Sequence, residues 1–301
     1  MTLAVSGEQF ELRHGEQRAV VVEVGGALRR YSVGDRDVLE GFGRREAADS
    51  GRGQPLLPWP NRVRDGRYEW DGEILQLSLS DTRFGHAIHG LVRWRNWQVL
   101  AWEPSRLTVG LRLYPMDGYP FTLGLAIDYE LSDAGLRVVT RAENLGNQAC
   151  PYGAGFHPYL TIGGPIDGAR LTVPAERILT TDERLIPVSS EPVAGTPYDF
   201  RVPREIGPLV LDDCFHELIR DAGERACVRL ETPGAAVTVW IGNAYGYVMV
   251  YTGDTLAHSD RRRRALAVEP MTCAPNAFAS GEGLLRLEPA QTHAAEWGIE
   301  L

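Results

Sequence analysis

Five short segments of the sequence place an ionisable or amide side chain among apolar and aromatic residues. They are Pro58–Arg62, Ala87–Leu91, Gly155–Tyr159, Leu211–Phe215 and Ala267–Thr272. Burying such a group is unfavourable unless it has a partner or a task. Together they supply a carboxylate and imidazoles suited to acid–base catalysis, and a guanidinium suited to holding hydroxyl groups. Taken singly, each also has a structural explanation, because a lone buried histidine is often a hydrogen-bonded core residue.

The basic residues exclude several kinds of chemistry. All 31 residues of the lysine-plus-arginine count are arginine. This excludes Schiff-base aldolases, pyridoxal-phosphate enzymes and the phosphate-loop lysine of Walker-type NTPases. Gly41–Gly43 and Gly153–Gly155 each lack the third glycine of the dinucleotide fingerprint, and no G-x-S-x-G elbow occurs. We therefore expect no cofactor.

Potential metal ligands do not fall at the usual spacings. His86 and His89 are three apart, so on a strand they would point to opposite faces. Asp212–Glu217 is dense in ligand types but has no second cluster with metal-ligand spacing. The four cysteines form no C-x-x-C pair, which disfavours a zinc site and suits a reducing cytoplasm. The sequence therefore predicts no metal and a cytoplasmic location.

The elements that must position these residues are strands. Apolar residues alternate with others over Leu107–Leu113, Phe121–Leu131 and Val237–Ile241, which is typical of strands with one buried face. Asp-Gly within Tyr68–Leu75 predicts a hairpin. Turn residues are frequent, and no long apolar stripe at helical spacing is present. We predict an all-β antiparallel sandwich in a single domain, residues 1–301.

Bulk properties limit the partners. The formal charge of −9 gives no basic face for nucleic acid. No signal peptide and no apolar run of about 18 residues is apparent, so we expect no membrane association. Arg261–Arg264 is interpreted as an exposed loop among acidic residues. We expect a monomer or a homodimer.

Taken together and in this order, the segments resemble the aldose 1-epimerase (galactose mutarotase) family. The resemblance spans roughly residues 20 to 297, nearly the whole chain. The matching motifs are Asn61-Arg62 with Gly66 to Gly72, His89-Gly90 with Trp94 or Trp97, His157-Pro158-Tyr159, Asp212 to Phe215, Tyr251-Thr252-Gly253, and Glu269 to Asn276. The resemblance implies a large mutarotase-like β-sandwich that interconverts the anomers of a small-molecule sugar.

The resemblance also implies roles for individual residues. Glu269 would be the catalytic base and His157 the catalytic acid. The sugar would be bound by Arg62, His89, Asp212 and Asn61, with His89 able to assist near the ring oxygen. One of three aromatic side chains, Trp59, Phe156 or Trp240, would stack on the sugar, unless these residues belong to the core.

Two departures from the family pattern leave the substrate open. The usual His-Gly-Gly is His-Gly-Leu at His89–Leu91, and Asp213 stands where the family has a histidine. The sequences of Pro58–Arg62 and Ala87–Trp94 resemble a bacterial branch with sulfoquinovose-type and free-hexose mutarotases more closely than they resemble galactose mutarotases proper. A neutral or sulfonated aldohexose is therefore the expected substrate. A hexose-6-phosphate 1-epimerase and a non-catalytic carbohydrate-binding protein on the same scaffold are the alternatives.

Overall fold

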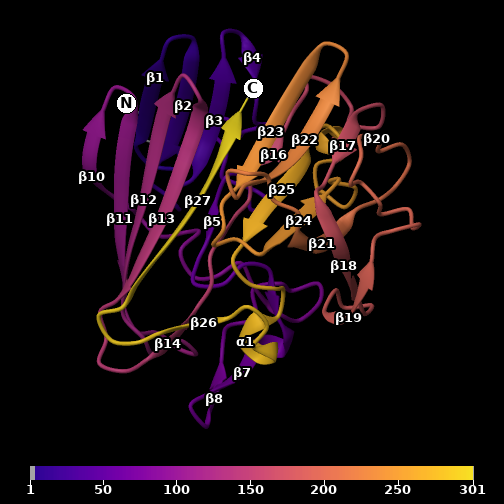
Figure 1. Ribbon diagram of the computed structural model, residues 1–301. Helices are drawn as coiled ribbons and strands as arrows, with labels where there is room; N and C mark the ends of the chain where they lie inside the picture. The colour runs from indigo at the N-terminus through magenta and orange to yellow at the C-terminus, as the bar shows by residue number, and fades with distance from the viewer. Residues whose placement is uncertain (1–3, 301) are drawn as a thin grey trace.

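Antiparallel strands form almost all of the regular structure, so the predicted all-β class is confirmed (Figure 1). The computed structural model describes residues 4–300; residues 1–3 and 301, at the two ends of the predicted domain, lie outside the described residues. The helices are single turns: η1 (Arg64–Gly66), η2 (Ser259–Arg261) and α1 (Ala277–Ser280). No helix within residues 4–300 is long and apolar enough to span a membrane.

Two large sheets and one smaller sheet make up the sandwich. The nine-stranded sheet contains, in spatial order, β10 (Gln98–Glu103), β11 (Arg106–Leu113), β12 (Leu123–Ser132), β13 (Gly135–Asn144), β27 (Thr292–Glu300), β23 (Ala235–Ile241), β22 (Ala226–Thr232), β17 (Arg170–Thr172) and β20 (Arg204–Glu205). The eight-stranded sheet contains β19 (Pro187–Pro192), β18 (Ala175–Thr181), β21 (Asp212–Leu218), β24 (Tyr247–Tyr251), β25 (Leu266–Met271), β15 (Gly155–Phe156) and β5 (Pro55–Leu56), with β16 (Tyr159–Leu160) also paired to β25.

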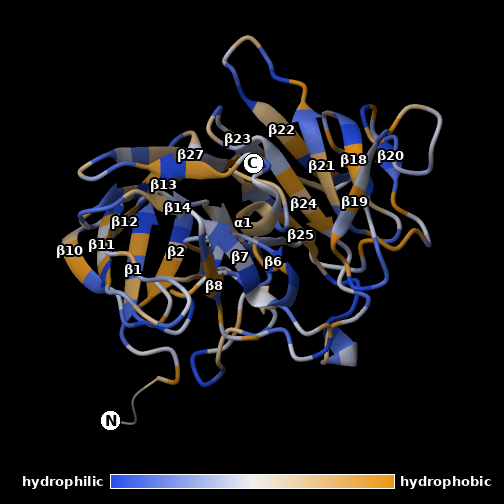
Figure 2. Ribbon diagram, turned by 90° about the horizontal axis from the view of Figure 1, so that it is seen from below, coloured by the Kyte–Doolittle hydropathy of each residue, from blue (hydrophilic) through white to orange (hydrophobic). Residues whose placement is uncertain are grey.

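The third sheet and three strand pairs complete the fold. The four-stranded sheet contains β1 (Gln9–His14), β2 (Gln17–Val22), β3 (Leu28–Val33) and β4 (Arg36–Asp37). The pairs are β6 (Arg62–Val63) with β9 (Ala87–Ile88), β7 (Arg67–Trp70) with β8 (Glu73–Gln76), and β14 (Cys150–Tyr152) with β26 (Leu285–Leu287). The four-stranded sheet lies against the β10–β13 half of the nine-stranded sheet, and the eight-stranded sheet lies near its β23–β22 half (Figures 1 and 2).

The predicted alternation corresponds to strands that bury one face. Leu123, Leu125 and Ile127 of β12 are buried, whereas Gly124 and Ala126 between them are partly exposed. Hydrophilic and hydrophobic bands follow one another along such strands (Figure 2). The predicted Tyr68–Leu75 hairpin is confirmed as β7–β8. Asp71 and Gly72 form its turn with φ of 49° and 83°, the left-handed backbone that Asp-Gly accepts.

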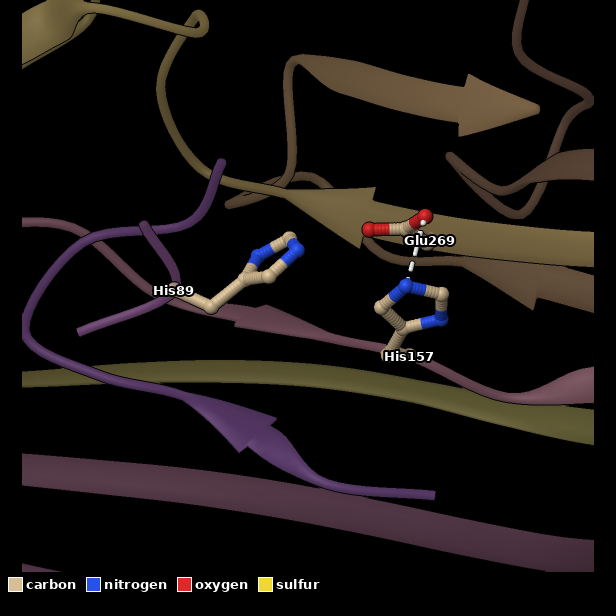
Figure 3. Close-up of side chains that lie close together, drawn as sticks. All are labelled: His89, His157 and Glu269. Atoms are coloured by element: carbon tan, nitrogen blue, oxygen red, sulfur yellow. Dashed lines mark ion pairs between the residues drawn. The ribbon is translucent and has the colours of Figure 1, made fainter. Parts of the chain in front are cut away.

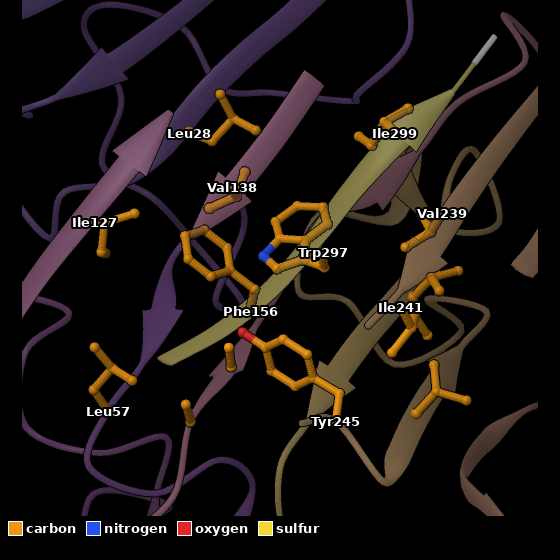
Figure 4. Packing of buried hydrophobic residues seen from close by; sticks show 14 of the residues in the cluster. Leu28, Leu57, Ile127, Val138, Phe156, Val239, Ile241, Tyr245, Trp297 and Ile299 are labelled. Atoms are coloured by element: carbon orange, nitrogen blue, oxygen red, sulfur yellow. The ribbon is translucent and has the colours of Figure 1, made fainter. Parts of the chain in front are cut away.

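A large hydrophobic cluster joins the sheets. It extends along the chain from Phe10 in β1 to Ile299 in β27 and includes side chains of the nine-, eight- and four-stranded sheets. Phe156 and Trp297 pack with ring centroids 5.1 Å apart among Val138 and Val239 (Figure 4). A shared core of this kind supports the prediction of one domain, which stays a prediction.

One interruption in the eight-stranded sheet bears directly on the site. Strands β15 and β16 both pair with β25, but His157 and Pro158 between them belong to neither strand. The register pairs Gly155 with Met271 and Tyr159 with Ala267. By that register His157 stands opposite Glu269, in the middle of β25.

Candidate active site

Glu269 and His157 face each other across the interrupted strand pair. His157 Nε2 lies 3.2 Å from Glu269 Oε1, and both side chains are buried (Figure 3). His157 Nδ1 and Glu269 Oε2 have no hydrogen-bond partner among the described residues. Buried polar atoms are normally paired, so exceptions of this kind need an explanation. Glu269 Oε2 is therefore a candidate for contact with a ligand, whereas His157 Nδ1 has no partner that orients the ring.

The β6–β9 strand pair places His89 beside His157. Asn61 and His89 flank the β6–β9 pair, and both adopt left-handed backbone with φ of 54° and 60°. The Asn61 N–H donates to His89 Nδ1 at 3.2 Å, and the His89 N–H donates to Asn61 O at 2.9 Å. A Cβ on Gly90 would lie 1.9 Å from the Leu57 carbonyl oxygen, so only glycine fits after the histidine. The His89 ring meets the His157 ring edge-on with centroids 5.4 Å apart.

Arg62 and Asp212 reach the cavity from different strand pairs. Arg62 Nε donates to Asp81 Oδ2 at 2.9 Å, which holds the guanidinium in place. Its backbone N–H donates to Asn61 Oδ1 at 2.8 Å. Asp212 lines the cavity, whereas the Asp213 carboxylate accepts the Asp212 N–H at 3.0 Å. The geometry thus favours Asp212 over Asp213 as the ligand-facing residue.

These side chains line one cavity of about 370 Å³. All six predicted residues, Asn61, Arg62, His89, His157, Asp212 and Glu269, are on its wall. Ile88, Tyr159 and Tyr251, which belong to the sequence motifs but were given no role at the site, also line it. Residues outside the assigned site that complete the wall are Ser50, Gly51, Ser80, Asp81, Thr82, Arg83, Arg93, Met249 and Thr255. A signal for Arg93 existed, because it lies in the same motif as His89, four residues further on.

Burial dominates the electrostatics of the cavity. It raises the pKa of Glu269 well above the usual value, assisted by the nearby negative charge of Asp212. Burial, then the cations of Arg93 and Arg52, lower the pKa of His157 to about 3. Burial also lowers the pKa of His89 and raises that of Asp212. Burial therefore favours the neutral forms of Glu269 and His157.

The site also has the composition of a metal-binding cluster. One potential ligand atom each from His89, His157 and Glu269 lie within 4.8 Å of one another. The sequence spacing concealed this cluster because its members come from three distant segments. The cations of Arg93 and Arg52 that lower the pKa of His157 also oppose binding of a metal cation there. The absence of a metal stays a prediction.

The aromatic candidates for sugar stacking belong to the core. Trp59 packs on Phe278 with centroids 5.1 Å apart, and Phe156 packs on Trp297. Trp240 lies under the Arg225 guanidinium, 4.1 Å from the ring centroid. None of the three lines the cavity. Of the two alternatives, the core one therefore holds for these residues, and the aromatic side chains on the cavity wall are Tyr159 and Tyr251.

His86 and His89 do not share a site, as their spacing predicted. The His86 ring is buried, where Nδ1 accepts the Asp65 N–H at 3.0 Å and Nε2 lies 3.2 Å from the Arg184 carbonyl oxygen. His86 is therefore a hydrogen-bonded core histidine, whereas His89 lines the cavity.

A model of the aldose 1-epimerase family matches residues 8–300. The chain belongs to the aldose 1-epimerase family. This confirms the resemblance of its motifs, and the protein is an isomerase that acts on carbohydrates.

Individual relatives support the assignment of this chain to the aldose 1-epimerase family. The uncharacterized protein YihR of Escherichia coli (strain K12) is 33% identical over 296 residues, covering 98% of this chain and 93% of YihR. Human galactose mutarotase is 30% identical over 227 residues, covering 69% of this chain and 64% of that enzyme. The crystal structure of galactose 1-epimerase from Lactobacillus acidophilus NCFM has a TM-score of 0.82 at 20% identity, covering 100% of this chain and 97% of that one. At that identity the structural likeness supports the fold alone.

Proposed function

We propose that this epimerase interconverts the α and β anomers of an aldohexose by acid–base opening and closure of the sugar ring. The observation that carries the proposal is the buried pair of Glu269 and His157, 3.2 Å apart on the wall of a cavity with hydroxyl-binding groups. Such a pair can take one proton from a ligand and return another. The reaction changes no oxidation state and transfers no phosphoryl group, so these residues suffice without a cofactor.

The proposed reaction moves two protons and one bond. In the reacting form the one proton of the pair is on His157, so Glu269 is a carboxylate and His157 an imidazolium. Glu269 then accepts the proton of the anomeric hydroxyl while His157 donates a proton to the ring oxygen. The bond between the anomeric carbon and the ring oxygen breaks, and its electron pair goes to that oxygen. The open-chain aldehyde then rotates and recloses on its other face, and both proton transfers run in reverse. His89 lies near enough to His157 to assist at the ring oxygen.

The remaining residues of the proposal bind and orient the sugar. Arg62 offers guanidinium N–H groups, and Asp212 offers carboxylate oxygens, to neighbouring hydroxyl groups. Asn61 contributes mainly through its neighbours, because its backbone N–H fixes His89 and its amide oxygen fixes Arg62.

The charge of the cavity supports a neutral or sulfonated aldohexose over a hexose 6-phosphate. Three guanidinium groups line it, from Arg62, Arg83 and Arg93, together with three carboxyl groups, from Asp81, Asp212 and Glu269. Arg62 is already paired with Asp81. A phosphate dianion needs more positive charge than a sulfonate, which carries a single charge, or a neutral hydroxymethyl group. Arg93 and Arg83 are the cations left to meet an acidic substituent.

Saturation-transfer NMR of anomer exchange tests the proposal directly. The purified protein is measured with glucose, galactose, sulfoquinovose and glucose 6-phosphate. We expect exchange above the uncatalysed rate, with a lower kcat/KM for glucose 6-phosphate than for at least one of the other three. A highest kcat/KM for glucose 6-phosphate would instead support the hexose-6-phosphate 1-epimerase. Tight binding without faster exchange of any panel sugar would support the carbohydrate-binding protein.

A further inference from the structure

The orientation of the His157 ring is not fixed by a hydrogen bond at its second nitrogen. Its Nδ1 is buried without a hydrogen-bond partner among the residues that the structure describes. Functional histidines are commonly oriented through the nitrogen that does not react. The plane of this imidazole must therefore be set by the groups that pack against it.

A stack of three side chains supplies that packing. The Tyr159 ring lies parallel to the His157 ring, with centroids 4.9 Å apart and an interplanar angle of 10°. The Arg52 guanidinium lies over the same tyrosine, its Cζ 4.5 Å from the ring centroid. The Tyr159 hydroxyl donates to Ser50 O at 3.1 Å, which ties the tyrosine to the segment that carries Arg52.

Arg52 is held more firmly than a stabilising role would require. Its side chain is 1% exposed, and Nη1 and Nη2 lie 2.7 and 3.3 Å from the carboxylates of Asp49 and Glu40. Its Nε also donates to the Glu40 carbonyl oxygen at 3.2 Å. Buried ion pairs are often no more stabilising than apolar side chains of similar volume. Stability alone therefore gives little reason for an arginine at this position.

The backbone around Arg52 is shaped to approach His157. Ser50, Gly51 and Gly53 have left-handed φ of 49°, 75° and 67°. A Cβ on Gly51 would lie 2.4 Å from His157 Cδ2. The Gly53 N–H donates to His157 O at 2.9 Å, so this segment contacts both the ring and the backbone of the histidine. Glycine adopts such φ values freely, so only Ser50 is in a backbone conformation unfavourable for its side chain, and conformations of that kind gather at functional sites.

We propose that Arg52 is a positioning residue that holds Tyr159, and through it the His157 imidazole, in the plane that aims Nε2 at Glu269. The inference rests on the proposed function, in which His157 moves a proton. It adds a task for the buried ion pairs of Arg52 with Asp49 and Glu40.

Loss of Arg52 should also change the titration of His157. The charged and titratable groups that face this imidazole are Glu269, His89, Arg93, Arg52 and Tyr159. After burial, the cations of Arg93 and Arg52 lower its pKa. Removing the Arg52 cation should raise the pKa of His157. The low-pH limb of the kcat/KM profile should then move to higher pH.

The test compares Arg52→Met with Arg201→Met. Arg201 also joins two carboxylates, Glu176 and Asp199, at 2.9 and 2.8 Å, but does not line the cavity. With glucose as substrate, we expect Arg52→Met to lower kcat by about 10–100-fold, the size of effect expected from a small misplacement. KM should stay near the wild-type value, and ¹⁵N NMR should show a raised His157 pKa. Arg201→Met should change neither kcat nor the His157 titration.

Tyr159→Leu provides the second variant, because it removes the ring through which Arg52 acts. It should lower kcat as Arg52→Met does, and the double variant should lose little more than the more impaired single variant. A folded Arg52→Met with wild-type kcat and His157 titration would overturn the proposal. If Arg52→Met does not fold, wild-type kcat in Tyr159→Leu would overturn it. If the wild-type protein exchanges no sugar, the proposed function fails, and the His157 titration in Arg52→Met still decides the positioning.

Discussion

Two hollows of the molecule differ in a way that identifies the functional one. The hollow over β10–β13 and β27 has a volume of about 860 Å³, and the cavity beside β25 has about 370 Å³. The larger one is lined by exposed Leu100 and Tyr114 and by Arg141, which is half exposed and paired with Asp128. The smaller one brings two buried ionisable groups with unpaired polar atoms face to face, His157 and Glu269. Among the described residues that line the larger one, a single such atom occurs, Nδ1 of the partly exposed His293. Burial of ionisable groups, rather than size, marks the site.

The sharpest test of this comparison makes the same substitutions in both hollows. Glu269→Gln and His157→Asn should each lower kcat by about 10²–10⁴-fold, because positioned acid–base groups contribute that much. Glu143→Gln and His293→Asn are the matched controls, since both residues line the larger hollow. They should leave kcat near the wild-type value. Both Glu269→Gln and His157→Asn keeping more than about a tenth of wild-type kcat would reject the assignment.

Combining the two active-site substitutions shows whether the pair acts as a unit. The double variant should lose much less than the product of the two single losses, because residues that act together are not additive. Strict multiplicativity in single-turnover kinetics would mean that Glu269 and His157 serve separate steps.

A smaller effect is expected from the residues that hold the sugar. Charge-assisted hydrogen bonds contribute roughly 1.5–3 kcal/mol, so Arg62→Ala or Asp212→Ala should weaken sugar binding about 10–150-fold. Asp213→Ala is the matched control, because its carboxylate contacts a backbone N–H rather than facing the cavity. Calorimetric titration measures the affinities. Weak binding in Asp213→Ala with normal binding in Asp212→Ala would place the contact one residue later.

The same two regions show what a sequence can reveal. Three strands of the nine-stranded sheet, β11, β12 and β23, could be predicted from alternation because their apolar side chains are buried. The predicted second strand began at Phe121, whereas β12 begins at Leu123. The six residues that line the cavity as predicted could be found from the sequence because each matched a family motif. Arg93 and Asp81 were missed because an arginine or aspartate in sequence does not show whether it faces a cavity or solvent. The choice between stacking and core burial stayed open for Trp59 for the same reason.

The metal-ligand analysis shows a related limit. Spacing rules detect ligands that share one element, whereas His89, His157 and Glu269 meet only because β9, β15–β16 and β25 lie together. The Arg261–Arg264 run was interpreted as an exposed loop. Arg263 in fact pairs with Asp167 and Asp254 at 2.9 and 3.0 Å. Pairing between distant segments is information that a local pattern does not contain.

Burial of Glu269 should also lower the stability of the folded protein, and this loss should depend on pH. Burial raises the pKa of Glu269 above its unfolded value, so its contribution to stability falls as pH rises from the ordinary glutamate pKa through the folded one. Glutamine does not ionise, so Glu269→Gln should remove the loss of stability that develops as pH rises. Its Tm should exceed that of the wild type by more at pH 8 than at pH 5. A gain in Tm of Glu269→Gln that is independent of pH would contradict the raised pKa.

The smallest expected effect is that of a chelator, and it bears on whether the cavity is an acid–base site or a metal site. His89, His157 and Glu269 could supply three ligand atoms within 4.8 Å. Against this, the His89 Nδ1 already accepts the Asn61 N–H, and Arg93 carries a positive charge beside both imidazoles. The proposed reaction needs only proton transfer. Prolonged dialysis against EDTA should therefore leave kcat/KM unchanged, with metal content followed by elemental analysis. Activity that is lost on dialysis and restored by one divalent ion would show that the three side chains hold a metal.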